Sequence, residues 1–112
     1  MALGGHGTAN MTGNLIPREM AVISKLWETG EDAFKCREAW LTNLPVLHFV
    51  YSAINPVAVK TLMRVIGLSS GPLRKPLQPA SPAILDAGLK AFSDLGLAEK
   101  HGLKVWPEAV AA

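Results

Sequence analysis

Apolar residues recur at helical spacing in several separate stretches of this chain. Met20, Ile23 and Trp27 stand at i, i+3 and i+7, which places them on one face of a helix. Pro17 suits the first turn of that helix, since its missing N–H would be unpaired there, and Gly30 is a typical residue for its end. The pattern predicts a first helix over residues 17–30.

The longest periodic stretch predicts a second helix from Glu31 to Tyr51. Pro45 lies inside it and should kink or divide it, because proline cannot donate the backbone hydrogen bond of a helix interior. The apolar stripe of this helix is expected to consist of Phe34, Trp40, Leu41, Leu44, Leu47 and His48.

Two further helices are each introduced by a polar residue followed by proline. Asn55 is expected to cap a helix that Gly67 closes, and Ser81 a helix that Gly96 ends. The proline-rich residues 68–80 between them predict an extended connection. The buried faces are expected to be Val59, Leu62, Met63 and Ile66 in the first of these helices and Leu85, Leu89 and Phe92 in the second.

Only one short segment, Gly7 to Met11, has the pattern of a β-strand. A lone strand cannot pair its backbone N–H and C=O groups, and even a two-stranded hairpin is marginal in water. The segment therefore belongs to a sheet whose other strands are missing, or it is not a strand here. If it stays unpaired, we expect it to be poorly ordered or to drive self-association.

Composition narrows the class of protein. The 112 residues are 49% hydrophobic, which permits a packed core. The net charge is only +2 and the sequence has no cluster of basic residues, which argues against a nucleic-acid-binding protein. No apolar run is long enough to cross a membrane, and a single cysteine suits a reducing compartment, so we expect a cytoplasmic protein. No residue spacing predicts a metal site or a phosphate-binding loop.

The glycine-rich start resembles the dihydrodipicolinate synthase / N-acetylneuraminate lyase family. That family carries a Gly-Gly-x-Gly-x-x-Ser-x-x-x-Asn-x-x-x-Arg run, which here begins at Gly4, has Asn10 in place of the serine, and ends with Asn14 and Arg18. Further motifs follow in the family's order, namely Asn55-Pro56-x-x-x-Lys60, Ile66-Gly67-Leu68 and Leu73-Arg74-x-Pro76-Leu77.

The resemblance implies a mostly α chain that completes a TIM (β/α)8 barrel. Residues 1–30 would be the eighth strand, loop and eighth helix of the incomplete barrel. Residues 31–98 would form a three-helix C-terminal appendage, and residues 99–112, which show no clear periodicity, a tail.

The resemblance also implies the chemistry of a class I aldolase, a lyase or synthase acting on pyruvate or a related 2-keto acid without a cofactor. A lysine forms the Schiff base, and a tyrosine relays protons. In the family both residues lie on earlier strands, which would place them upstream of Met1. We therefore expect no catalytic residue in this chain, no activity of the chain alone, and a homo-oligomer at full length.

Barrel enzymes bind substrate at the C-terminal ends of their strands, so Thr8, Ala9 and Asn10 are expected to contact it. The family usually has Val-Ile-Ser here, and its middle residue contacts the bound pyruvate; by position that residue is Ala9. Alanine is smaller than the family's isoleucine by about three methyl(ene) groups, so the substrate pocket would be larger by that amount. The added space would admit a bulkier keto acid, or would be filled by a change elsewhere. The alternative role for Ala9 is simple packing against a neighbour.

Other candidate side chains have plainer expected roles. The lysines favour solvated surface positions, with a structural or interface role for Lys60. His6 has no carboxylate nearby, and His48 is expected in the core or at an interface. Asn14 and Arg18 are expected to fix the loop and the helix start. A stand-alone helical binding or assembly module, without catalysis, is the alternative function.

Overall fold

The structure is a computed structural model, and it describes residues 1–106. Its elements in chain order are the 3-10 helix η1 (Thr12–Asn14), α1 (Pro17–Ile23), α2 (Gly30–Val50), α3 (Val57–Val65), α4 (Pro82–Asp94) and α5 (Leu97–Lys100). The chain is therefore mostly helical, as the sequence predicts. None of these helices is long and apolar enough to cross a membrane.

The predicted strand over Gly7–Met11 is absent. Residues 5–10 have no regular secondary structure and are exposed, and residues 1–106 contain no other strand to pair with them. A backbone that finds no neighbouring strand leaves its N–H and C=O groups to water. Residues 1–106 therefore contain no strand of the incomplete barrel that the resemblance implies.

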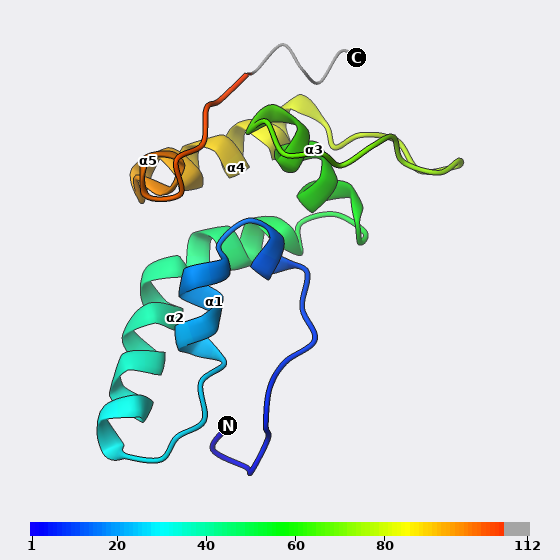
Figure 1. Cartoon of the computed structure of the whole chain (residues 1–112). Helices are drawn as coiled ribbons and strands as arrows, with labels where there is room; N and C mark the ends of the chain where they lie inside the picture. Colours follow the sequence, from blue (N-terminus) through cyan, green and yellow to red (C-terminus); the bar gives the residue numbers. More distant parts are fainter. Residues whose placement is uncertain (107–112) are drawn as a thin grey trace.

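Figure 1 shows the helices in two groups, with α1 beside α2 and with α3, α4 and α5 on the other side of α2's second half. The N-terminal segment (residues 1–11) runs past α1 and α2, and the connection of residues 68–81 extends away from α3. The segment and the connection each form one wall of a cavity described below.

The first predicted helix is too long. α1 ends at Ile23, Trp27 lies in the following loop with 42% of its surface exposed, and Gly30 begins α2 instead of ending α1. The physical reason is a capping box: the Thr29 hydroxyl accepts from the Asp32 N–H, and the Asp32 carboxylate accepts from the Thr29 N–H. These bonds satisfy two donors at the start of a helix, so the chain starts a new helix there.

α2 occupies almost the predicted range and runs through Pro45 without dividing. Its ribbon changes direction along its length (Figure 1), as expected when the bond from position 45 to the Leu41 carbonyl is missing. The predicted stripe is only partly buried: Leu47 is in the core, whereas Phe34, Trp40, Leu41 and His48 are exposed. The positions actually buried in its second half are Asn43, Val46, Leu47, Phe49 and Val50.

The residues predicted to start and end α3 and α4 are confirmed, except for the cap of α3. Ser81 caps α4 by accepting from the Ile84 N–H, as predicted. Asn55 makes no capping hydrogen bond, because α3 begins at Val57 with Pro56 in the cap position. Gly67 does end α3, in a left-handed conformation (φ +77°).

The hydrophobic core lies between the two groups of helices, and α1, α2, α3, α4 and α5 all contribute to it. Its buried members are Leu15, Ile16, Met20, Ile23, Val46, Leu47, Phe49, Val50, Ala58, Val59, Leu62, Val65, Ile66, Leu85, Phe92 and Leu97. The predicted faces of α3 and α4 are thus confirmed, with Met63 and Leu89 half-buried at the edge.

α5 was not predicted. It begins after Gly96, which is left-handed, and buries Leu97 completely. Beyond it, the Trp106 N–H donates to the Val65 carbonyl at the end of α3 (2.6 Å). The first part of the predicted tail therefore contacts the helices, and residues 107–112 of that tail lie outside the described residues.

Candidate functional site

The predicted substrate contacts lie on the N-terminal segment, held in place by polar side chains. The Thr8 hydroxyl lies 2.8 Å from that of Ser24 at the end of α1, and the Asn10 amide donates to Thr8 Oγ1 (3.1 Å). Asn10 Oδ1 also accepts from the Gly13 N–H (2.7 Å), which fixes the entry into η1. The side chains of Thr8 and Asn10 therefore stabilise the conformation of the N-terminal segment.

Thr8, Ala9 and Asn10 line one cavity of about 590 Å³ between the segment and the helices. Met20 and Ile23 come from α1, and α2 supplies a wall that includes Trp40 and Leu44. Asn10 and Ala9 also line a second cavity of about 530 Å³, which extends toward Asn14 and Asn55. The structure thus brings the three predicted residues to one concave surface, with Ala9 between two open spaces.

The 590 Å³ cavity is mainly apolar and contains few polar side chains. His48 and Tyr51 join Thr8, Asn10 and Thr12 as its polar members, and no lysine, arginine or acidic residue lines it. Among the described residues, a carboxylate ligand would meet no lysine or arginine at this surface. A Schiff base needs a desolvated amine, and no side chain lining this cavity supplies one.

The lysines occupy the positions expected of surface residues. The Lys25 ammonium pairs with Asp32 (2.6 Å), and Lys35 pairs with Glu31 one helical turn away (2.6 Å). The hydrogen bond to Asp32 raises the pKa of Lys25, which is the opposite of what a nucleophilic amine requires. Lys60 donates to the Pro72 carbonyl (3.0 Å), in keeping with a structural role.

His48 was expected in the core or at an interface; it is exposed, so the core position is wrong and the interface position stays a prediction. Its side chain lines the cavity. His6 is exposed on the N-terminal segment. Asn14 donates to the Met11 carbonyl (2.9 Å) and so fixes the loop as expected, whereas Arg18 donates to the Lys100 carbonyl (3.3 Å), far along the chain. In the described part of the chain no group of three His, Cys, Asp or Glu side chains is arranged to hold a metal ion.

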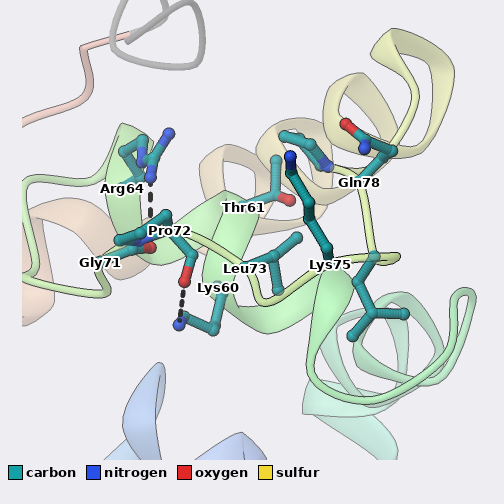
Figure 2. Close-up of a pocket in the computed structure, with 10 residues that line it drawn as sticks. Lys60, Thr61, Arg64, Gly71, Pro72, Leu73, Lys75 and Gln78 are labelled. Carbon is teal, nitrogen blue, oxygen red and sulfur yellow. Dashed lines mark hydrogen bonds between the residues drawn. The ribbon is translucent and has the colours of Figure 1, made fainter.

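One cluster of basic side chains was not predicted from the sequence. Lys60 and Arg64 on α3, together with Lys75 on the following connection, line a pocket of about 250 Å³ (Figure 2). The spacing of Lys60 and Arg64, one helical turn apart, was a signal for two basic side chains on one face. That Lys75 joins them depends on how the connection folds back, which no local pattern predicts.

Comparison with solved structures places these helices in a known class of enzyme. They match part of the crystal structure of a dihydrodipicolinate synthase with a TM-score of 0.77 and 30% sequence identity, covering 86% of this chain and 33% of that one. The family model described as "Dihydrodipicolinate synthetase family" matches residues 1–92. The chain belongs to this family.

Curated relatives give the same result. The chain is 38% identical over 91 residues to the 4-hydroxy-tetrahydrodipicolinate synthase of Leptothrix cholodnii, covering 81% of this chain and 30% of that protein. It is 29% identical over 102 residues to the synthase of the same name from Methanopyrus kandleri, covering 91% of this chain and 34% of that protein. The chain thus spans about a third of the length of the relatives it matches.

Proposed function

We propose that this chain is one part of a Schiff-base-forming lyase or synthase that acts on pyruvate or a related 2-keto acid. The observation that carries the proposal is the family match over residues 1–92, in a chain that spans about a third of 4-hydroxy-tetrahydrodipicolinate synthases. In the reaction a lysine amine adds to the ketone and water leaves, so that the resulting protonated imine draws electrons from the neighbouring carbon–carbon bond.

In this proposal the lysine and the tyrosine come from the part of the enzyme that precedes these residues. Residues 1–30 complete a TIM barrel, within which residues 7–11 gain strand partners, and residues 31–98 form the helical appendage. Thr8, Ala9 and Asn10 then lie at the substrate end of the last strand. The exposure of residues 5–10 and their lack of strand partners support such an arrangement, because a paired strand would satisfy these backbone groups.

Ala9 is the residue proposed to set the choice of keto acid. It lines both cavities next to the N-terminal segment and has the smallest side chain among the residues lining the larger one. If the segment joins a barrel, a larger apolar side chain at position 9 would reduce the space beside the substrate. The full-length oligomer and the cytoplasmic location stay predictions.

A hybrid enzyme tests this proposal. The corresponding last third of the Leptothrix cholodnii synthase is replaced by this chain, and the hybrid is treated with pyruvate and borohydride, which reduces a Schiff base to a stable adduct. We expect the adduct by mass spectrometry on a lysine of the Leptothrix part, and none on the 112-residue chain alone. A folded hybrid that forms no adduct, or an adduct on any lysine of this chain, would refute the proposal.

Substrate choice is tested in the same hybrid by Ala9→Ile. We expect this variant to favour pyruvate over a bulkier 2-keto acid by about tenfold in kcat/KM relative to the unsubstituted hybrid, a difference of about 1.4 kcal/mol. The matched control is Ala21→Ile, an exposed position on α1 outside the cavity. Equal shifts in both variants would remove Ala9 from the substrate site.

A helical binding or assembly module is the second candidate, since the described helices bury a common core without a barrel. Several large apolar side chains are exposed, among them Trp27, Phe34 and Trp40, and this fits either candidate. Exposed apolar surface of this kind marks a contact with further protein. The same hybrid distinguishes the two candidates, because a binding module would give no adduct in any context.

A further inference from the structure

The pocket beside α3 is lined by basic side chains and by neutral groups, without an acidic residue. It has a volume of about 250 Å³, and its polar side chains are Lys60, Thr61, Arg64, Lys75 and Gln78. Lysine, arginine and the amide of glutamine all present N–H donors. We propose that this pocket binds a small anion through a phosphate or carboxylate group.

Two of the cations are held in place by the backbone of the connection. The Lys60 ammonium donates to the Pro72 carbonyl (3.0 Å), and the Arg64 guanidinium donates to the Gly71 carbonyl (3.1 Å). Figure 2 shows these two side chains on opposite sides of the Gly71–Pro72 segment. The bonds fix the connection against α3 and hold both positive charges at the rim of the pocket.

Lys75 supplies the third positive charge from the opposite wall. No hydrogen bond or ion pair of its ammonium occurs in residues 1–106, in contrast to Lys25, Lys35 and Lys90, which each pair with a carboxylate. Three like charges around one pocket repel each other, and an anion between them would remove that repulsion. Among the described residues that line the pocket there is no Asp or Glu to offset these charges.

The remaining polar side chain, Thr61, forms part of the wall and does not act as a donor to the ligand. Its buried hydroxyl donates to the Val57 carbonyl (2.8 Å) and accepts from the Ala80 N–H (3.0 Å). The bond from Ala80 fixes the C-terminal end of the connection to α3. The pocket is thus shaped by the backbone before any ligand binds, which lowers the entropic cost of binding.

The pocket has space for a phosphate or a short dicarboxylate with a few waters, each of which occupies about 30 Å³. Lys75 and Gln78 are exposed, so solvent and salt screen the attraction, and we expect a dissociation constant of about 1 mM at low ionic strength. This site shares no lining residue with the cavity at Thr8, Ala9 and Asn10. The proposal therefore stands independently of the proposed enzyme activity.

The test uses the full 112-residue chain labelled with ¹⁵N. Sodium phosphate and sodium succinate are titrated separately at constant ionic strength, with chloride as the balancing ion. We expect saturable shifts of amide signals in residues 60–64 and 71–79. Tighter binding of phosphate would identify a phosphorylated ligand, and tighter binding of succinate a carboxylate. Absence of saturable shifts in these residues with both anions would overturn the proposal.

Matched variants separate a site from general charge attraction. Lys75→Gln is expected to weaken binding at least fivefold, a loss of about 1 kcal/mol, and Lys75→Arg to retain it. Lys35→Gln on α2 removes the same charge away from the pocket and should leave binding unchanged. Equal weakening in Lys35→Gln and Lys75→Gln would show unspecific attraction and refute the site. Amide signals outside the pocket report whether each variant keeps its fold.

Discussion

Glu19 at the start of α1 and His101 directly after α5 meet side chain to side chain, although 82 residues separate them in the chain. Glu19 Oε2 lies 2.9 Å from His101 Nε2, and only 17% and 7% of the two side chains are exposed. The neighbouring Arg18 guanidinium donates to the Lys100 carbonyl (3.3 Å). α1 is therefore tied to α5 and to His101, so α5 belongs to the same folded unit as α1.

We predict that Glu19 and His101 stabilise the fold through each other. In a double-mutant cycle of Glu19→Ala and His101→Ala, the coupling free energy should be about 0.5–3 kcal/mol, because the contact is largely shielded from water. Urea unfolding followed by circular dichroism gives the four free energies. The exposed pair Lys90 and Asp94 is the control and should couple by at most about 0.5 kcal/mol. Additive effects of the two alanine substitutions would contradict the prediction.

The contact between α2 and α4 depends on Gly88. A Cβ atom added there would lie 2.7 Å from Cδ2 and from Cζ of the buried Phe49 ring, closer than carbon atoms pack in proteins. Gly88→Ala should lower the free energy of unfolding by about 1–3 kcal/mol, because overpacking exceeds the gain of about 1 kcal/mol in helix propensity. Urea unfolding of the variant measures the difference.

Two further variants check the cause of this effect. Asp86→Ala, at an exposed position of the same helix, should leave stability within about 0.5 kcal/mol of the parent. Adding Phe49→Leu to Gly88→Ala should restore part of the loss, because the smaller side chain makes room. A stabilised Gly88→Ala variant would show that the helices separate at no cost.

Sequence reasoning succeeded where a local signal decides the structure. Ser81 caps α4 through its own hydroxyl, and Gly67 ends α3 because it takes the left-handed conformation that other residues rarely adopt. The buried faces of α3 and α4 were also predicted, because their apolar residues recur at helical spacing. The capping box at Thr29 and Asp32 is equally local, and its pattern would have assigned Gly30 to the start of α2.

Sequence reasoning failed where the outcome depends on distant parts of the molecule. Phe34 and Trp40 are exposed because α1, with seven residues, covers too little of α2. The segment at Ala9 is not a strand because no partner strand is present. The three predicted site residues do share a cavity, yet its other wall comes from α2 and could not be deduced from the glycine-rich run.

The hydroxyl of Thr61 is predicted to hold the connection to α3. Thr61 is only 5% exposed, and it is the acceptor for the Ala80 N–H (3.0 Å). Thr61→Val keeps the shape of the side chain but leaves that buried N–H unpaired, so the free energy of unfolding should fall by about 1–3 kcal/mol. Thr42→Val, exposed on α2, is the control and should change it by less than about 0.5 kcal/mol. Equal effects of both variants would mean that the bond to Ala80 contributes nothing.

The capping box at the start of α2 is predicted to make stability depend on pH in acid. The Lys25 ammonium and the Thr29 hydroxyl and N–H lower the pKa of Asp32 from 3.8 to about 2, against the opposing effect of burial. Because the folded state favours the charged carboxylate, this contribution to stability is complete above about pH 4 and is lost as the pH falls through about 2. Asp32→Asn should therefore flatten the fall in unfolding free energy over that interval.

The pKa itself can be measured by NMR titration of the Asp32 side-chain carboxyl. Lys25→Gln should raise the pKa of Asp32 from about 2 toward the ordinary value of 3.8, because the hydrogen bond from the Lys25 ammonium, which contributes most to the shift, is removed. Thr29→Ser keeps the hydroxyl of the capping box and should leave the pKa near that of the parent chain. If Asp32 in the parent chain titrated at its ordinary value, the carboxylate would not be held by Lys25 and Thr29. α2 would then begin without the stabilising bonds that separate it from α1.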